Sequence, residues 1–168
     1  MTAESGGALV DVLVEEARWT EVGLERLAET AASAALSAVG RDPGRHELTL
    51  LACGDTRIAG LNESFRGKPV ATNVLSWPAF EGAPPEPGSA LAGEEPLFLG
   101  DLAIAYGTCA AEAAAAGVSL ADHATHLVVH GVLHLLGHDH EVEAEAEAME
   151  AIETKVLASL GIDDPYSY

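Results

Sequence analysis

The chain has 168 residues, 48% of them hydrophobic and 21% charged, and this length suits one globular domain with a core of its own. Its 27 acidic and 8 basic residues give a formal net charge of −19, which argues against a broad basic surface that holds nucleic acid by counterion release. The two cysteines, Cys53 and Cys109, form no C-x-x-C motif, so neither a disulfide framework nor a cysteine zinc site is predicted, and a reducing cytoplasm is favoured.

The N-terminal part of the chain predicts a strand followed by a helix. Residues 8–16, ALVDVLVEE, have the β-branched content of a strand, and residues 20–40 repeat apolar side chains at helical spacing. Thr20 is the expected N-cap of that helix and Gly40 its end. The N-terminal residues lack the basic start and the long apolar core of a signal peptide. No apolar run reaches the length of about 18 residues that a membrane-spanning helix needs. We therefore expect a protein that is not exported and does not span a membrane.

The middle of the chain predicts two strands, a short helix and a long loop. Residues 46–53 and 72–78 are rich in strand-forming side chains, and the second strand ends at a proline. Residues 55–66 place apolar side chains at helical spacing behind an opening Asp-Thr pair that supplies the N-cap. Residues 79–96 are rich in proline and glycine, so we expect a surface loop within the domain.

The C-terminal half predicts one more strand and three helices. The strand covers residues 97–107, and the helices cover residues 108–117, 119–137 and 141–161, the second of them capped by a serine. The last segment begins with a strand-like alternation, but alanine favours a helix. Together these elements predict four strands and about five helices in one domain, residues 1–168, without repeats.

A pair of histidines in the predicted helix 119–137 has metal-ligand spacing. His130 and His134 are one helical turn apart, so both imidazoles project from one face and reach one ion with zinc-to-nitrogen distances of about 2 Å. His126 is one turn earlier, but roughly 12 Å of helical rise separates it from His134, which is too far for both to bind one ion. The third ligand must therefore come from elsewhere.

His140 is the expected third ligand. Gly137 can adopt the left-handed conformation that ends the helix, after which the chain turns and brings His140 back toward the pair. Three nitrogen ligands leave a fourth position for water, as in catalytic zinc sites. His138 is the rival ligand, although the spacing of His130, His134 and His140 favours His140.

Other residues near the pair are expected to surround the metal. His123 and His126 fit packing in the core or contacts with the ligands, with a metal role as the alternative. His138 would line the site, and Asp139 is placed to orient a ligand imidazole. Zinc proteases of this spacing carry a glutamate after the first histidine as general base, and Gly131 stands in that place here. This argues against peptide hydrolysis by the usual zinc scheme.

Four segments, from about residue 46 to the end of the chain, occur in a characteristic order. They read LNESFRGKPVATNVLSWP, LGDLAIAYG, HLVVHGVLHLLGHDH and DDPYSY. In this order they resemble the YbeY family of bacterial endoribonucleases and rRNA maturation factors. The resemblance implies a single α+β domain with a small mixed sheet and a zinc site on a central helix. It also implies a metal-dependent cut in single-stranded RNA, without DNA specificity.

The resemblance further implies the roles of several residues. One zinc ion is held by His130, His134 and His140, and His130 and Arg66 are the catalytic candidates. Arg66 would bind substrate phosphate near the metal, which suits a guanidinium because its forked donors match phosphate oxygens. Lys68, in the same R-G-K segment, is a further substrate-binding candidate. Taken alone, Arg66 would instead be interpreted as forming an ion pair with the glutamate three residues earlier.

The chain departs from the family pattern beside the R-G-K segment. Pro69 and Ala71 stand where the family usually has Asp and Pro, which puts a catalytic role for an acid there in doubt. Asp101 resembles a recurrent family position, for which we expect a structural contact or a contact around the metal ligands.

The resemblance places the implied reaction in ribosome biogenesis. The family acts on the 3′ end of small-subunit rRNA and in ribosome quality control, with the small ribosomal subunit and assembly factors as partners. The net charge of −19 opposes binding of bulk RNA, which favours an alternative: a partner-dependent assembly factor with a structural metal. A second alternative is a zinc protease or amidase that uses a distant carboxylate such as Asp101 as its base.

Overall fold

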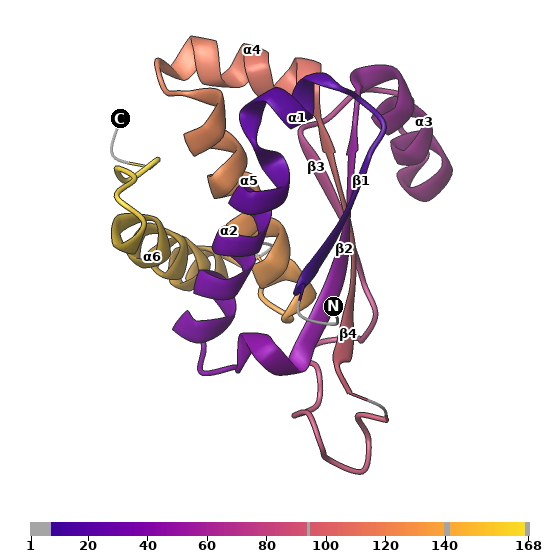
Figure 1. Cartoon of the computed structure of the whole chain (residues 1–168), viewed down its shortest axis with the longest axis vertical. Coiled ribbons are helices and arrows are strands. Elements are labelled where there is room, and N and C mark those ends of the chain that lie inside the picture. The colour runs from indigo at the N-terminus through magenta and orange to yellow at the C-terminus, as the bar shows by residue number, and fades with distance from the viewer. Residues whose placement is uncertain (1–7, 94, 140–141, 167–168) are drawn as a thin grey trace.

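Four strands form the centre of the structure: β1 (Val10–Val14), β2 (His46–Cys53), β3 (Val74–Pro78) and β4 (Leu97–Ala105). The structure is a computed structural model that describes residues 8–93, 95–139 and 142–166. The strands pair in the order β1-β2-β4-β3 (Figure 1). β1 and β2 are parallel, as are β2 and β4, whereas β3 runs antiparallel to β4 and forms an edge of the sheet.

Helices pack on both faces of this sheet. Within the described residues they are α1 (Arg18–Val22), α2 (Leu24–Ala38), α3 (Asp55–Arg66), α4 (Tyr106–Ala116), α5 (Leu120–Leu135) and α6 (Glu143–Ser159), with a short 3-10 helix, η2 (Pro43–Arg45). None of these helices is long and apolar enough to cross a bilayer. The expected α+β class with a small mixed sheet is therefore confirmed, and the five expected helices become six because one of them is broken.

The main hydrophobic core lies between one face of the sheet and the helices α2, α5 and α6 (Figure 1). The central helix is α5, which contacts α2, α4 and α6 as well as β3 and β4. Its Val128, Val129, Val132 and Leu133 side chains are buried. Such burial is the main stabilising term, at roughly 25 cal/mol per Å² of apolar surface, so α5 is a rigid support for the side chains it carries. On the other face, α3 covers a smaller apolar cluster around Ile58.

The helix expected over residues 20–40 is two helices, which corrects the sequence prediction. Gly23 has φ +75° and ends α1, and its backbone N–H donates to the Thr20 carbonyl. Thr20 is therefore inside α1 and does not cap a helix. The break turns α1 so that Trp19 is fully buried and its indole N–H donates to the Cys53 carbonyl over 3.0 Å. Burial of this aromatic side chain accounts for the break.

The prediction that an Asp or Thr side chain caps α3 is also wrong. Gly54 occupies the N-cap position, and no side chain caps this helix. The Asp55 carboxylate instead accepts hydrogen bonds from the Thr108 backbone N–H (2.8 Å) and hydroxyl (3.0 Å) in the first turn of α4. α4 begins at Tyr106, two residues earlier than expected. Asp55 thus caps a helix that lies far from it in sequence.

The loop of residues 79–96 is held to the body of the protein by two arginines. Arg41 donates to the carbonyls of Pro84 (2.6 Å) and Pro85 (3.2 Å), and Arg45 donates to the carbonyl of Pro87 (3.1 Å). Most of this loop is exposed, as expected. Its first residues, however, form one wall of the cleft described next.

Candidate metal centre and substrate cleft

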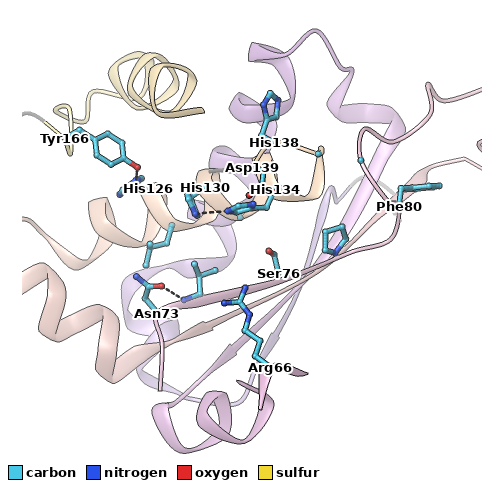
Figure 2. Close-up of a pocket in the computed structure, with 16 residues that line it drawn as sticks. Arg66, Asn73, Ser76, Phe80, His126, His130, His134, His138, Asp139 and Tyr166 are labelled. Atoms are coloured by element: carbon cyan, nitrogen blue, oxygen red, sulfur yellow. Dashed lines mark hydrogen bonds between the residues drawn. The ribbon is translucent and has the colours of Figure 1, made fainter. Parts of the chain in front are cut away.

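A cleft of about 780 Å³ lies between α5 and the edge strand β3 (Figure 2). Side chains from β3 and the loop after it form one wall, and α5 with the segment after it forms the other. The lining residues are Arg66, Asn73, Val74, Ser76, Pro78, Phe80, Gly82, His126, Leu127, His130, Gly131, His134, Gly137, His138, Asp139 and Tyr166. Most of the residues proposed from the sequence as parts of a metal site are therefore brought to one concave surface.

His130 and His134 face each other in this cleft. Their Nε2 atoms lie 3.0 Å apart, and their rings are nearly perpendicular, with centroids separated by 4.6 Å (Figure 2). Two nitrogens bound to one zinc ion at tetrahedral angles would be roughly 3.3 Å apart. The helical spacing of the two residues therefore produces the convergence on one point that a shared ion needs.

Glu153 determines which nitrogen of His130 faces the cleft. The Glu153 Oε2 atom lies 2.9 Å from His130 Nδ1. An ionised carboxylate only accepts hydrogen bonds, so Nδ1 carries the proton and Nε2 keeps its lone pair. That lone pair faces the Nε2 atom of His134. Both histidines also make interactions besides these contacts.

The ionised state of Glu153 depends on its partners. Burial alone would raise the pKa of this carboxyl group, because its side chain is almost completely enclosed. Hydrogen bonds from His126, His130 and Tyr166 outweigh burial and lower the pKa to about 2. Burial and the contact with Glu153 also raise the pKa of Tyr166, so its hydroxyl stays protonated and donates. Glu153 is thus a carboxylate with a full set of donors.

His126 points to the carboxylate and not to the histidine pair. Its Nε2 atom lies 2.8 Å from Glu153 Oε1 and 3.2 Å from the Tyr166 hydroxyl. His123 is also turned away from the pair, since its Nε2 atom lies 2.8 Å from Glu112. Both histidines thus bond to carboxylates, and neither directs its Nε2 atom at the pair. Asp139 lines the cleft, whereas the His138 ring points away from the pair (Figure 2).

His140, the expected third ligand, lies outside the described residues. Over residues 8–93, 95–139 and 142–166, no three His, Cys, Asp or Glu side chains come close enough together to hold an ion. The donor set that is described fits two of the three nitrogen ligands of a zinc site. Gly137 has φ +95°, the left-handed conformation expected at the turn that leads toward His140.

The cysteines offer no alternative metal or nucleophilic chemistry. Cys53 and Cys109 are both buried, and burial is the largest cause of their raised pKa values, about 11 and about 12. Both side chains therefore stay protonated thiols at neutral pH, whereas metal binding and nucleophilic attack need the thiolate.

Arg66 extends into the cleft from the C-terminal end of α3 (Figure 2). Four other arginines, Arg18, Arg41, Arg45 and Arg57, each form an ion pair with a glutamate. Among the described residues, no carboxylate lies within ion-pairing distance of Arg66, so the alternative of a pair with the glutamate three residues earlier is not observed. Lys68 is exposed beyond the end of α3 and is not part of the lining of the cleft.

Asp101 makes a structural contact, one of its two expected roles, and does not contact the metal site. Leu102, its neighbour in β4, faces α5, so Asp101 projects from the opposite face of the sheet. There the Asp101 carboxylate accepts a hydrogen bond from the Thr49 hydroxyl of β2. Because the sheet separates Asp101 from the histidines, it cannot serve as a general base in this cleft.

Glu153 and Tyr166 are the site residues that sequence analysis missed. One signal was present: Glu153 lies on the apolar face of α6, one turn after Met149 and one turn before Leu157, both of which are buried. A charged residue in such a position needs buried partners. The identity of those partners was not available from the sequence, because His130 and Tyr166 are 23 and 13 residues away.

The fold and the cleft define a class: a single α+β domain that carries a histidine pair and an arginine in one concave site, as hydrolytic enzymes do. A family model described as Endoribonuclease YbeY matches residues 12–161, and the chain belongs to this family. A protein named Endoribonuclease YbeY from Dinoroseobacter shibae is 52% identical, over 95% of this chain and 91% of its own length. A protein of the same name from Ruegeria pomeroyi is also 52% identical, over 94% of this chain and 98% of its own length.

A solved structure has the same fold. The solution structure of TM1509 from Thermotoga maritima matches with a TM-score of 0.56 and covers 95% of this chain and 99% of its own. Its sequence is 19% identical, so the likeness concerns the fold. The family resemblance noted in the sequence is confirmed by the family model and by the relatives.

Proposed function

We propose that the protein is a zinc-dependent endoribonuclease of the cytoplasm that cuts single-stranded RNA. Its substrate is rRNA, in maturation of the 3′ end of the small-subunit rRNA and in ribosome quality control. The observation that carries the proposal is the facing pair of His130 and His134 in a cleft that also receives Arg66. The relatives support the reaction class, because they are named as endoribonucleases.

The histidines are the proposed metal ligands, with His140 as the third. A bound zinc ion supplies a Lewis acid that polarises a phosphoryl oxygen and makes water more acidic. Arg66 binds the phosphate group and stabilises the negative charge that grows on its oxygens during cleavage.

The edge of β3 supports RNA over a peptide as the substrate. The Ala105 N–H donates to the Asn73 carbonyl, and the Ala79 N–H donates to the Leu99 carbonyl. Hydrogen bonding alternates along antiparallel strands, so residues 73, 75, 77 and 79 bond to β4, and residues 74, 76 and 78 turn their backbone groups to the open edge.

Little of this open edge can pair with a peptide. The Val74 N–H is occupied, because it donates to the Asn73 side-chain oxygen over 2.7 Å, and Pro78 has no N–H. Ser76 keeps the remaining outward N–H group of β3. A peptide that binds as an added strand needs a row of such groups. The shortage of outward N–H groups on β3 disfavours the protease and amidase alternative. So does Gly131, which stands where zinc proteases have the glutamate that acts as general base.

The second candidate function is a partner-dependent assembly factor. The net charge of −19 and the pairing of four arginines with glutamates favour it, because such a surface repels bulk RNA. A docking partner such as the small ribosomal subunit or an assembly factor would then bring RNA to the cleft. In this version the metal supports structure and cleavage is negligible.

RNA cleavage and metal content, measured on the same preparations, test the proposal. The substrate is a single-stranded RNA that covers the 3′ end of small-subunit rRNA, and the variants are His134→Ala and Arg66→Ala. Arg57→Ala is the control, because Arg57 is an exposed arginine on the same helix that pairs with Glu15 over 3.2 Å. We expect His134→Ala to lose metal and cleavage, Arg66→Ala to lose cleavage alone, and the control to retain both. A fully metallated wild type that cuts no RNA would support the assembly factor instead.

A further inference from the structure

Glu153 is an ionised group at the centre of a buried hydrogen-bond network. Its residue exposure is 0%, and its carboxylate accepts from three side chains: His126 (2.8 Å), His130 (2.9 Å) and Tyr166 (2.6 Å). Removing a carboxylate from water is strongly unfavourable unless hydrogen bonds compensate for it. Three charge-assisted hydrogen bonds supply that compensation, and one of them comes from a candidate metal ligand.

The two oxygens of Glu153 have different partners. Oε1 takes both His126 and the Tyr166 hydroxyl, whereas Oε2 takes His130. Two donors on Oε1, one from α5 and one from the C-terminal segment (residues 160–166), fix the plane of the carboxylate. Oε2 is thereby held against His130 Nδ1, which leaves the Nε2 lone pair of His130 directed at His134.

The C-terminal segment holds Tyr166 in this network. The Tyr166 backbone N–H donates to the Asp164 carboxylate over 2.8 Å, and the same carboxylate oxygen accepts from the Thr154 hydroxyl of α6 over 3.2 Å. The Tyr166 ring also packs edge-on against His126, with centroids 5.5 Å apart. The segment is thus attached to α6 one residue from Glu153.

We propose that Glu153 is the positioning residue of His130 and that Tyr166 holds Glu153 in this role, so the C-terminal segment is part of the metal-binding apparatus. The inference rests on the proposed function, because it assumes that His130 binds zinc. Without the carboxylate, His130 can adopt the other tautomer or rotate, and the convergence of the two Nε2 atoms is lost. Loss of a group in this position typically weakens metal affinity about 10- to 100-fold.

The test is the zinc affinity of the full chain, measured by competition with a chromophoric chelator. Glu153→Gln should bind zinc about 10- to 100-fold more weakly than wild type. Its amide offers one oxygen and one NH₂ group, and three donors cannot all be accepted by them. Tyr166→Phe removes one neutral donor and keeps the ring, so we expect a loss of about three- to tenfold.

Glu112→Gln is the matched control. Glu112 also accepts from a histidine of α5, His123, over 2.8 Å, but that histidine does not face the pair. Its replacement should leave zinc affinity unchanged. Nitrogen-15 NMR of the histidine rings provides a second measurement: His130 should carry its proton on Nδ1 in metal-free wild type and become a mixture of tautomers in Glu153→Gln. Thermal unfolding identifies any variant that fails to fold. If Glu153→Gln fails to fold, the zinc affinity of Tyr166→Phe and the His130 tautomer of wild type test the inference.

The outcomes separate this inference from the proposed function. Glu153→Gln and Tyr166→Phe that bind zinc as tightly as wild type would overturn the positioning role and leave the ribonuclease proposal intact. Weaker zinc binding in both variants, with a wild type that binds zinc but cuts no RNA, would support the positioning role and refute the ribonuclease. A metal-free wild type with His130 protonated on Nε2 would also overturn the inference.

Discussion

Gly131 of α5 packs directly against Leu102 of β4: a β-carbon at Gly131 would lie 2.9 Å from the Leu102 Cδ2 atom and 3.2 Å from Cδ1. Zinc proteases with this histidine spacing place their glutamate base at the corresponding position. Here a larger side chain would have to displace the buried Leu102 side chain. The packing of α5 on β4 therefore favours glycine at this position.

Gly131→Ala should lower the free energy of unfolding relative to a glycine replacement in open space. Gly60→Ala in α3 is the matched control, since a β-carbon there meets nothing within 4 Å. Both changes gain up to about 1 kcal/mol of helix propensity. Only Gly131→Ala pushes on a buried leucine, so we expect it to be about 1–3 kcal/mol less stable than Gly60→Ala. Urea denaturation measures the difference, and equal stabilities would contradict the close packing.

Gly137→Ala should damage the turn after α5. The residue has φ +95°, and a β-carbon would lie 2.7 Å from the backbone of Gly82 and Ala83 in the loop that lines the cleft. Gly117→Ala is the control, because it shares the positive φ (+71°) but has open space around it. The positive φ alone costs about 1–2 kcal/mol in each variant. We expect Gly137→Ala to lose more stability than the control and to lose zinc affinity, which the control keeps in calorimetric titration.

Asp55→Ala should destabilise the protein through α4. Its carboxylate accepts two hydrogen bonds from Thr108, and loss of a helix cap costs about 0.5–2 kcal/mol. Glu63→Ala, an exposed residue of the same helix α3, is the control and should change stability by less than about 0.5 kcal/mol. Amide hydrogen exchange should show faster exchange in the first turn of α4 for Asp55→Ala. Unchanged exchange there would show that the cap is unimportant.

The stability of the metal-free protein should depend on Glu153 in acid. The pKa of Glu153 is lowered from 4.5 to about 2, so the folded state binds its proton less readily than the unfolded state does. The resulting stabilisation is complete above the unfolded pKa and is lost as pH falls from about 4.5 to about 2. Denaturant titrations across this range should show a smaller pH dependence in Glu153→Gln than in wild type. The same slope in both proteins would rule out this assignment.

Local patterns in the sequence predicted the parts of the site that depend on one helix. The period of the α-helix puts His130 and His134 on one face, Ser119 caps that helix by accepting from the Asp122 N–H, and Gly137 turns the chain after it. The expectation that Arg66 lies near this pair came from the family resemblance, since α3 and α5 pack on opposite faces of the sheet.

Contacts between distant segments decided the remainder. Gly23 breaks a helix because Trp19 must reach the core, and Asp55 caps α4 across 53 residues of sequence. Asp101 looked like a site residue, but alternation along β4 turns it to the opposite face from Leu102.

The sequence by itself determined the histidine pair, the strand and helix content and the family, because periodicity and motif spacing are properties of neighbouring residues. Only the tertiary structure decided that Glu153 and Tyr166 support His130 and that Gly131 packs against Leu102. Each of these relationships joins two or more elements, and the packing of those elements follows from the burial of the whole core.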